Sequence, residues 1–206
     1  MIHLLLHVIA LAPLLMILKK VSKNLRPTSR KLFFLSMITI LCWDVLDIFM
    51  QSSTNPGTAM LIRLLIMLSL SAGTLFFTLT GFLLGRIKTA YGLTIGMIPT
   101  LLFVISIPYV QVQKTASGFV AGYGLMTTIW QASVLVAFLI TSGILCLTKK
   151  KVDKENKRRL EWFSVGVLSL AIIGVVLSQA TKYFSIPNIS APLSALSTIL
   201  ILKAFK

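Results

Sequence analysis

The chain has 206 residues, of which 56% are hydrophobic and 12% are charged. Its mean hydropathy is +0.92, and its apolar share exceeds the roughly 45–50% that is usual for soluble domains. The charge is unbalanced, with 20 Lys and Arg against 5 Asp and Glu. In a soluble protein this excess would suggest nucleic-acid binding, but here the basic residues lie in short segments between long apolar stretches. The composition therefore predicts a membrane protein that binds no nucleic acid.

Seven apolar stretches occupy nearly the whole chain. A helix needs about 20 mainly apolar residues to cross a bilayer. We expect spans over residues 1–18, 32–50, 59–84, 91–110, 125–148, 162–180 and 187–202. Because the connections are short, the sequence predicts an all-α fold, in which one domain forms a polytopic bundle of seven transmembrane helices.

The first span contains two histidines, His3 and His7, which are four residues apart. On a helix this spacing would allow a shared metal ion or a pH sensor, but no third ligand is evident, so we predict no metal site and favour a position at the membrane interface. The span lacks a preceding basic segment, and Pro13 directly follows the small residues of Ala10-Leu11-Ala12. We therefore expect it to be retained rather than cleaved as a signal peptide.

The second span carries Asp44 and Asp47, the only acidic residues inside an apolar stretch. Residues three apart share one face of a helix. At a rise of 1.5 Å per residue from Leu32, they lie roughly 10 and 6 Å below the outer surface of a core about 30 Å thick. An unpaired charge there costs at least a few kcal/mol (roughly 2.5 to 3.5), so each aspartate should face the bundle interior, be paired or be protonated.

The third span brings a potential partner, Arg63, to its outer end, after an uncharged turn that contains Asn55-Pro56-Gly57. Arg63 could pair with Asp47 or extend its side chain to the interface. Three alternatives stay open: a structural salt bridge, which we favour, a ligand or proton site, and no interaction.

The later spans add polar side chains in their outer halves, among them Gln131 in the fifth and Gln179 in the sixth. Hydrogen bonds between helices are the ordinary role of such groups in membrane bundles. The functional alternative is an outward-facing pocket, in which Asp44, Asp47, Arg63, Gln131 and Gln179 form a ligand-binding or intramembrane charge cluster. The segment 111–124, which connects the fourth and fifth spans, contains Lys114 and three glycines and is expected to be a loop.

The segment 149–161 is strongly charged, with seven basic and three acidic residues. Glu155 and Arg159 are four apart in the order that favours a helix, so we expect a helical extension of the fifth or sixth span. Its basic residues should lie against the anionic headgroups of the lipid bilayer at the cytoplasmic face.

The basic residues also predict the orientation. Seventeen of the 20 lie in the segments after the first, third and fifth spans or in the C-terminal tail, and three, Arg63, Lys114 and Lys182, lie on the other side. The positive-inside rule then places the N-terminus outside and the C-terminus in the cytoplasm of a multi-pass cell-membrane protein. Only an odd number of spans fits this arrangement.

Three stretches resemble the N-terminal seven-transmembrane sensor region of bacterial sensor histidine kinases. They are Trp43 ahead of an acid, the segment IRLLIMLSLSAGTLFFTLTGFLLGR (62–86) with its early arginine, and the last two spans from Arg158 with Pro192 near the start of the seventh. The similarity extends over about residues 29–205. It lacks the family's dimerisation helix, phosphoacceptor histidine and nucleotide domain, so the chain would be a fragment or a freestanding relative.

The resemblance implies a sensory or ligand-binding membrane module that relays an external or membrane stimulus to a cytoplasmic kinase, cyclase or other signalling partner, and that could form a homodimer. A small secondary transporter, with the buried charges as a relay, is the alternative, as is a membrane accessory subunit. No nucleotide-binding loop, nucleophile or metal-binding motif is present, so we expect no catalytic residues, no cofactor and no enzymatic activity.

Overall fold

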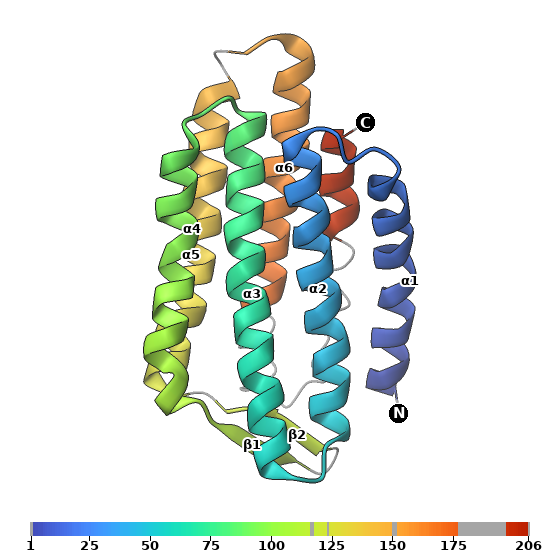
Figure 1. The fold of residues 1–206 in the computed structure, drawn as a ribbon, viewed down its shortest axis with the longest axis vertical. Coiled ribbons are helices and arrows are strands. Elements are labelled where there is room, and N and C mark those ends of the chain that lie inside the picture. The colour runs from blue at the N-terminus through green and yellow to red at the C-terminus, as the bar shows by residue number, and fades with distance from the viewer. Residues whose placement is uncertain (1, 116–117, 123, 150–151, 177–196, 206) are drawn as a thin grey trace.

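A computed structural model describes residues 2–115, 118–122, 124–149, 152–176 and 197–205. Long helices run along the major axis of an elongated bundle (Figure 1). The elements in chain order are α1 (Ile2–Ser22), α2 (Thr28–Ser52), α3 (Pro56–Leu84), α4 (Thr89–Ser106), the 3-10 helix η1 (Ile107–Tyr109), β1 (Val112–Thr115), β2 (Gly118–Ala121), α5 (Leu125–Thr148), α6 (Lys154–Ala171), the π-helix η3 (Ile172–Val176) and the 3-10 helix η4 (Lys203–Phe205). Residues 197–202 are helical as well.

The predicted all-α character is confirmed in outline, and α5 coincides with the predicted span 125–148. Helices α2 and α3 begin a few residues earlier than predicted. Of the predicted seventh span 187–202, residues 187–196 lie outside the described residues, as do residues 177–180 of the sixth.

Local capping explains two of the helix starts. The Asn55 side chain accepts hydrogen bonds from the backbone N–H groups of Gly57 (2.8 Å) and Thr58 (3.3 Å), and Pro56 occupies the first turn, where its missing N–H costs nothing. Asp153 accepts from the backbone N–H of Asn156 at 2.8 Å. Because of this cap, α6 begins inside the charged segment and extends beyond the neighbouring helices (Figure 1). The predicted helical extension is confirmed.

The segment 111–124, predicted as a loop, instead contains an antiparallel β-hairpin, in which Val112 pairs with Ala121 and Thr115 with Gly118. The hairpin lies across the end of the bundle where α2 ends and α3 begins (Figure 1). Its side chain Phe119 is buried in a cluster with Trp43 and Met50. Two strands alone are marginally stable in water, so this contact with the helices holds the hairpin in place.

Gly118 makes the close approach of the hairpin possible. It has a φ of 126°, a conformation that side chains strongly disfavour, and a Cβ atom here would collide with the backbone carbonyl of Gln51 at the end of α2. Only glycine therefore fits between the hairpin and the helix end.

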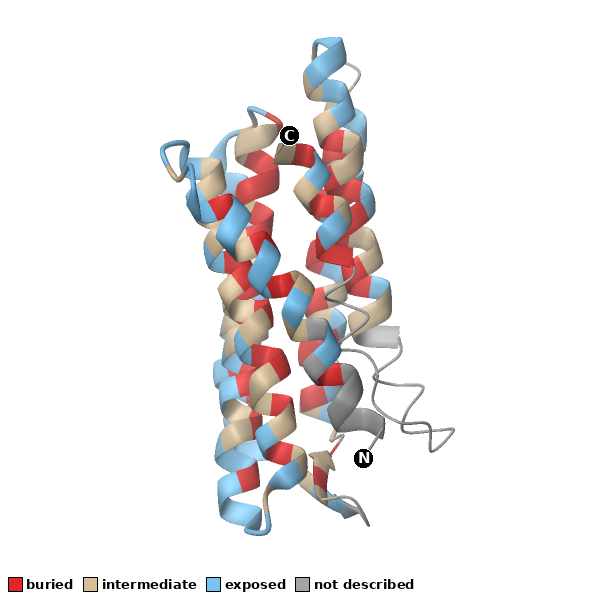
Figure 2. Ribbon diagram, turned by 90° about the vertical axis from the view of Figure 1, so that its right-hand side faces the viewer, coloured by how far each residue is buried: buried red, intermediate tan, exposed pale blue. Residues whose placement is uncertain are grey.

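Buried and exposed residues alternate along the helices (Figure 2), and many of the exposed residues are large and hydrophobic. On α4, for example, Leu101, Val104 and Ile105 are each 57% exposed. A contiguous apolar surface of this kind is costly in water but matches the hydrocarbon of a bilayer. Within the described residues, four helical segments are long and apolar enough to cross a membrane, namely Thr28–Ser52, Pro56–Leu84, Thr89–Tyr109 and Leu125–Thr148.

The C-terminal helical segment is fastened at the end of the bundle opposite the hairpin. Arg30 donates a hydrogen bond to the backbone carbonyl of Phe205 at 2.9 Å, and the Phe205 ring stacks on Phe33 with centroids 4.4 Å apart. The ammonium group of Lys203 lies 4.2 Å from the centre of the Trp162 ring on α6. The chain's last turn is thus held by both α2 and α6.

Candidate functional site

Three ionisable side chains from α1 and α2 meet inside the bundle. The Nδ1 atom of His7 is hydrogen-bonded with Asp44 Oδ1, and its Nε2 atom lies 3.5 Å from Asp47 Oδ2. All three residues are buried, with exposed fractions of 0, 0 and 2%. The amide of Gln51, one turn further along α2, donates to Asp47 Oδ2 at 3.1 Å. Two carboxylates therefore converge on one imidazole ring.

The helical repeat brings these groups together. Along α2 the buried positions recur every three or four residues, and both aspartates belong to this inward face: Phe33, Ser36, Met37, Ile40, Trp43, Asp44, Asp47 and Met50. On α1, His7 lies two turns from the buried Leu14, which lies two turns from the buried Val21. His7 thus continues the inward stripe of α1 towards the hairpin end.

Arg63 lies on the facing side of α3 and is 5% exposed. Its guanidinium carbon is 6.0 Å from the centre of the Trp130 ring on α5, which is within reach of a cation–π interaction. The indole N–H of Trp130 in turn donates to Ser71 Oγ at 2.9 Å. These contacts join α3 to α5 next to the carboxylates.

Arg63 does not make the salt bridge with Asp47 that we favoured from the sequence. Within the described residues, the ion-pair partner of Asp47 is His7, whereas Arg63 acts on Asp47 through a longer-range coulombic attraction. The arginine thus contributes positive charge to the aspartate's surroundings while its guanidinium carbon lies 6.0 Å from the centre of the Trp130 ring. Among the described residues, His7 rather than Arg63 has the geometry of a salt bridge with Asp47.

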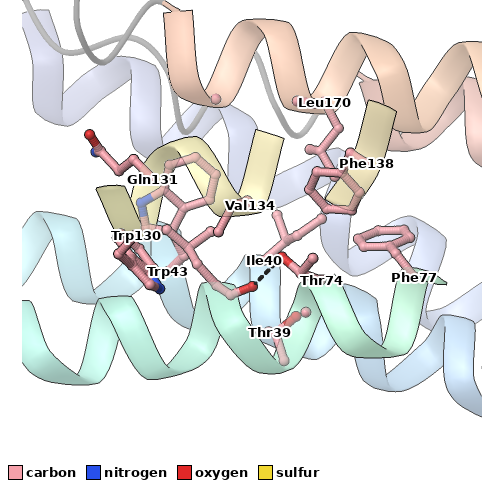
Figure 3. A pocket seen from close by; sticks show the side chains of 14 residues that line it. Thr39, Ile40, Trp43, Thr74, Phe77, Trp130, Gln131, Val134, Phe138 and Leu170 are labelled. Carbon is pink, nitrogen blue, oxygen red and sulfur yellow. Dashed lines mark hydrogen bonds between the residues drawn. The ribbon is translucent and has the colours of Figure 1, made fainter. Parts of the chain in front are cut away.

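A largely apolar pocket of about 50 Å³ adjoins this cluster (Figure 3). Roughly 10–15 Å³ holds one water molecule, so the pocket could take a few waters or a small part of a ligand. It is lined by residues of α2, α3, α5, α6 and η3: Thr39, Ile40, Trp43, Leu70, Gly73, Thr74, Phe77, Trp130, Gln131, Val134, Phe138, Leu170, Ala171 and Gly174.

The polar groups of the pocket are few. The hydroxyls of Thr39 and Thr74 donate to carbonyls of their own helices, at 2.7 and 2.8 Å, so that their oxygen atoms remain available as acceptors. Gln131 is 8% exposed, and its amide group lies at one end of the pocket (Figure 3). Two lining residues connect the pocket to the ionisable residues: Trp43 precedes Asp44 in the chain, and the Trp130 ring lies 6.0 Å from the Arg63 guanidinium carbon.

The pocket reaches the π-helix η3 at Gly174. A π-helical turn widens the helix locally and is often found at functional sites. Here it follows directly on α6, so that the pocket wall and the charged end of α6 belong to one continuous helical segment.

Sequence reasoning identified some of these residues and missed others. Asp44, Asp47 and Arg63 gather at the hairpin end of the bundle, Gln131 borders the adjoining pocket, and Gln179 lies outside the described residues. His7 was assigned to the interface, which is wrong, because it is buried against both aspartates. Its position could have been predicted from the regular spacing of His7, Leu14 and Val21, which follow one another at intervals of seven residues and therefore share one face of α1. Among the described side chains, no group of three has the geometry of a metal site.

No protein-family model matches this chain, and neither does any curated protein sequence.

Proposed function

We propose that the chain is a seven-span sensory module of the cell membrane, with its N-terminus outside and its C-terminus in the cytoplasm. In this proposal a stimulus from outside or from the bilayer acts on the pocket and the charge cluster, and a cytoplasmic kinase, cyclase or other signalling protein receives the output. The module has no enzymatic activity of its own. Its support is the resemblance described above, the uneven distribution of basic residues and one feature of α6.

That feature is the continuity of α6 between the pocket and the C-terminal segment. Leu170, Ala171 and Gly174 line the pocket, and Trp162, two turns or more away on the same helical segment, contacts Lys203. Phe163 also meets Phe205 edge to face, with centroids 6.5 Å apart. A packed helix moves as a rigid body, so a ligand that displaces the pocket end of α6 would displace the C-terminal turn.

Filling the pocket with a side chain tests this coupling without a known ligand. In a background with Cys42 and Cys146 replaced by Ala, spin labels at Lys31 of α2 and Lys157 of α6 report the distance between the charged ends of these helices. We expect Ala171→Phe, which fills the pocket, to shift the distance distribution. Val165→Phe, on the exposed face of α6, is the matched control and should leave it unchanged. Identical distributions for the two variants would argue against a sensory coupling through α6.

A second measurement addresses the absence of catalysis. The purified chain, incubated with labelled ATP, should neither phosphorylate itself nor release phosphate, because its sequence has no nucleotide-binding motif. Phosphate transfer by this polypeptide alone would contradict the proposal.

A small secondary transporter is the second candidate, and the buried His7, Asp44 and Asp47 favour it, because ionisable residues inside membranes often form proton or ion relays. Reconstitution in vesicles that contain a pH-sensitive dye distinguishes the two functions. Proton flux that Asp44→Asn abolishes would support transport, whereas tight vesicles would support the sensor.

A further inference from the structure

We infer that His7, Asp44 and Asp47 form a proton-binding site, in which the three side chains share one exchangeable proton beyond the one that a neutral imidazole carries. This inference does not depend on the proposed sensory function. A chain that failed to couple the pocket to α6 could still bind the proton here.

The argument is a count of protons. A neutral imidazole has one N–H donor and one nitrogen with a lone pair. Both ring nitrogens of His7 face carboxylate oxygens, Nδ1 towards Asp44 Oδ1 and Nε2 towards Asp47 Oδ2 at 3.5 Å. With no further proton, one lone pair of the ring would point at a negatively charged oxygen. A proton on that nitrogen, or on the facing carboxyl group, turns this repulsion into attraction.

Burial makes the proton count matter. The side chains of His7, Asp44 and Asp47 are 1, 0 and 3% exposed, so water does little to screen them. The Nε2 atom of His7 and the Oδ2 atom of Asp44 are buried, and each has no hydrogen-bond partner among the described residues. Two buried polar atoms of one cluster that have no hydrogen bond to a described residue need an explanation, and a proton bound within the cluster supplies one.

The charges of the surrounding helices agree with a bound proton. Among the described residues, the ionisable groups that face the cluster are the two aspartates of α2 and Arg63 of α3, with the neutral amide of Gln51 on Asp47. Two carboxylates, one guanidinium and an imidazolium sum to zero charge.

Gln51 connects the site to the hairpin end of α2. Gln51, which donates to Asp47, is half-buried and lies one turn nearer to the end of α2, where Gly118 of the hairpin packs against its backbone. The proton would therefore exchange with the outer solvent in the proposed orientation.

Nitrogen NMR of the full chain in lipid nanodiscs tests the inference. The chain has two histidines, so His3→Gln leaves His7 as the only ring signal in a sample labelled at histidine nitrogen and aspartate carbon. An ordinary histidine is about one-tenth protonated at pH 7.5. At this pH we expect either an imidazolium signal from most molecules or a neutral ring together with one protonated aspartate carboxyl. A neutral ring beside ionised carboxylates would overturn the inference.

Substitutions complete the test. If the ring is an imidazolium, Asp44→Asn should reduce the protonated population of His7 several-fold. If the ring is neutral, the same substitution should remove the protonated-carboxyl signal and shift the signals of the ring nitrogens. Glu155→Gln, which removes an exposed acid at the far end of α6, should leave these signals unchanged. Size-exclusion elution and thermal unfolding report whether each variant is folded. Asp47→Asn is the second variant to use if Asp44→Asn does not fold. An unchanged His7 spectrum in the folded aspartate variant would show that the carboxylates hold no shared proton with the ring.

Discussion

At the scale of single residues, two kinds of polar contact occur inside the bundle. Most buried hydroxyls donate to a carbonyl one turn earlier in their own helix, as Thr78 does to Thr74 at 2.8 Å and Thr80 to Phe76 at 2.7 Å. These bonds are made within one helix, although Thr78 also accepts a hydrogen bond from Thr141 of α5 at 3.4 Å. The contacts of His7 with α2 and of Trp130 with Ser71 join different helices, so they contribute to the choice of neighbours in lipid.

The His7–Asp44 contact should be measurable as a coupling energy. We expect His7→Leu and Asp44→Leu each to lower the free energy of unfolding in detergent, because each leaves its partner buried without a counterpart. The double variant should cost less than the sum by about 1 kcal/mol or somewhat more. A double-mutant cycle read by thermal or denaturant unfolding gives this number.

Two comparisons make that cycle interpretable. The pair Asp47→Asn and Arg63→Gln should show a smaller coupling, because Arg63 acts on Asp47 at longer range. Thr80→Val, which removes a hydroxyl bound to its own helix, should change stability little. Additive losses for His7 and Asp44 would mean that the two side chains do not stabilise each other.

At the scale of elements, glycines set how closely the helices approach. A Cβ atom at Gly96 of α4 would lie 2.8 Å from the Cα of Leu75 on α3, and one at Gly81 of α3 would lie 2.8 Å from the Phe163 ring on α6. The small residues therefore allow backbone contact, as is common between membrane helices. Gly143 of α5, by contrast, faces open space.

The hairpin depends on one such position. Gly118→Ala should destabilise the chain by about 1 to 3 kcal/mol, because the new methyl group meets the Gln51 carbonyl and the backbone conformation disfavours a side chain. Gly143→Ala should be neutral or slightly stabilising, since it adds a methyl group in open space within a helix. Thermal unfolding of the two variants checks this, and equal melting temperatures would mean that the hairpin does not press on α2.

The start of α6 should respond to pH through its cap. Hydrogen bonds from the backbone N–H and the side chain of Asn156 lower the pKa of Asp153 below its ordinary value of 3.8. Since the folded-state pKa is the lower one, the cap's contribution is complete above 3.8 and is lost as the pH falls through the lowered value. Amide exchange at Asn156 and Lys157 should accelerate over that interval.

Two variants separate the cap from its charge. Asp153→Asn should keep a capping oxygen and remove the pH dependence, while Asp153→Ala should accelerate amide exchange at all pH values. Exchange that is equally slow in all three proteins would mean that α6 does not need this cap.

At the scale of the whole molecule, the distribution of basic residues fixes an expected orientation. We expect a reporter that is active only in the cytoplasm to be active when fused at Lys206, and one that is active only outside to be active when inserted at Ser117. Activity of the cytoplasmic reporter at Ser117 would reverse the orientation. Activity of the cytoplasmic reporter at both sites would rule out an odd number of spans between Ser117 and the tail.

Hydropathy and helix periodicity predicted much of this architecture, and the exceptions have physical reasons. The apolar length of α5 and the inward face of α2 follow from composition and spacing, so Asp44 and Asp47 could be predicted as buried neighbours. The hairpin could not, because each strand has only four residues and gains its stability from Phe119 packing on helix side chains. The sequence also could not predict that His7 is the residue that contacts Asp47, because this contact depends on how α1 packs against α2.

The pairing of α1 with α2 has a consequence for biogenesis. His7 and Asp44 are 37 residues apart, so the imidazole leaves the ribosome well before the carboxylate that it meets. Until α2 has been synthesised, α1 holds a polar ring that hydrocarbon does not solvate. If α1 crosses the membrane, as the proposed topology requires, the translocon should release α1 and α2 together as a helical pair. In a chain arrested after α1, this helix should remain beside the translocon rather than enter the lipid.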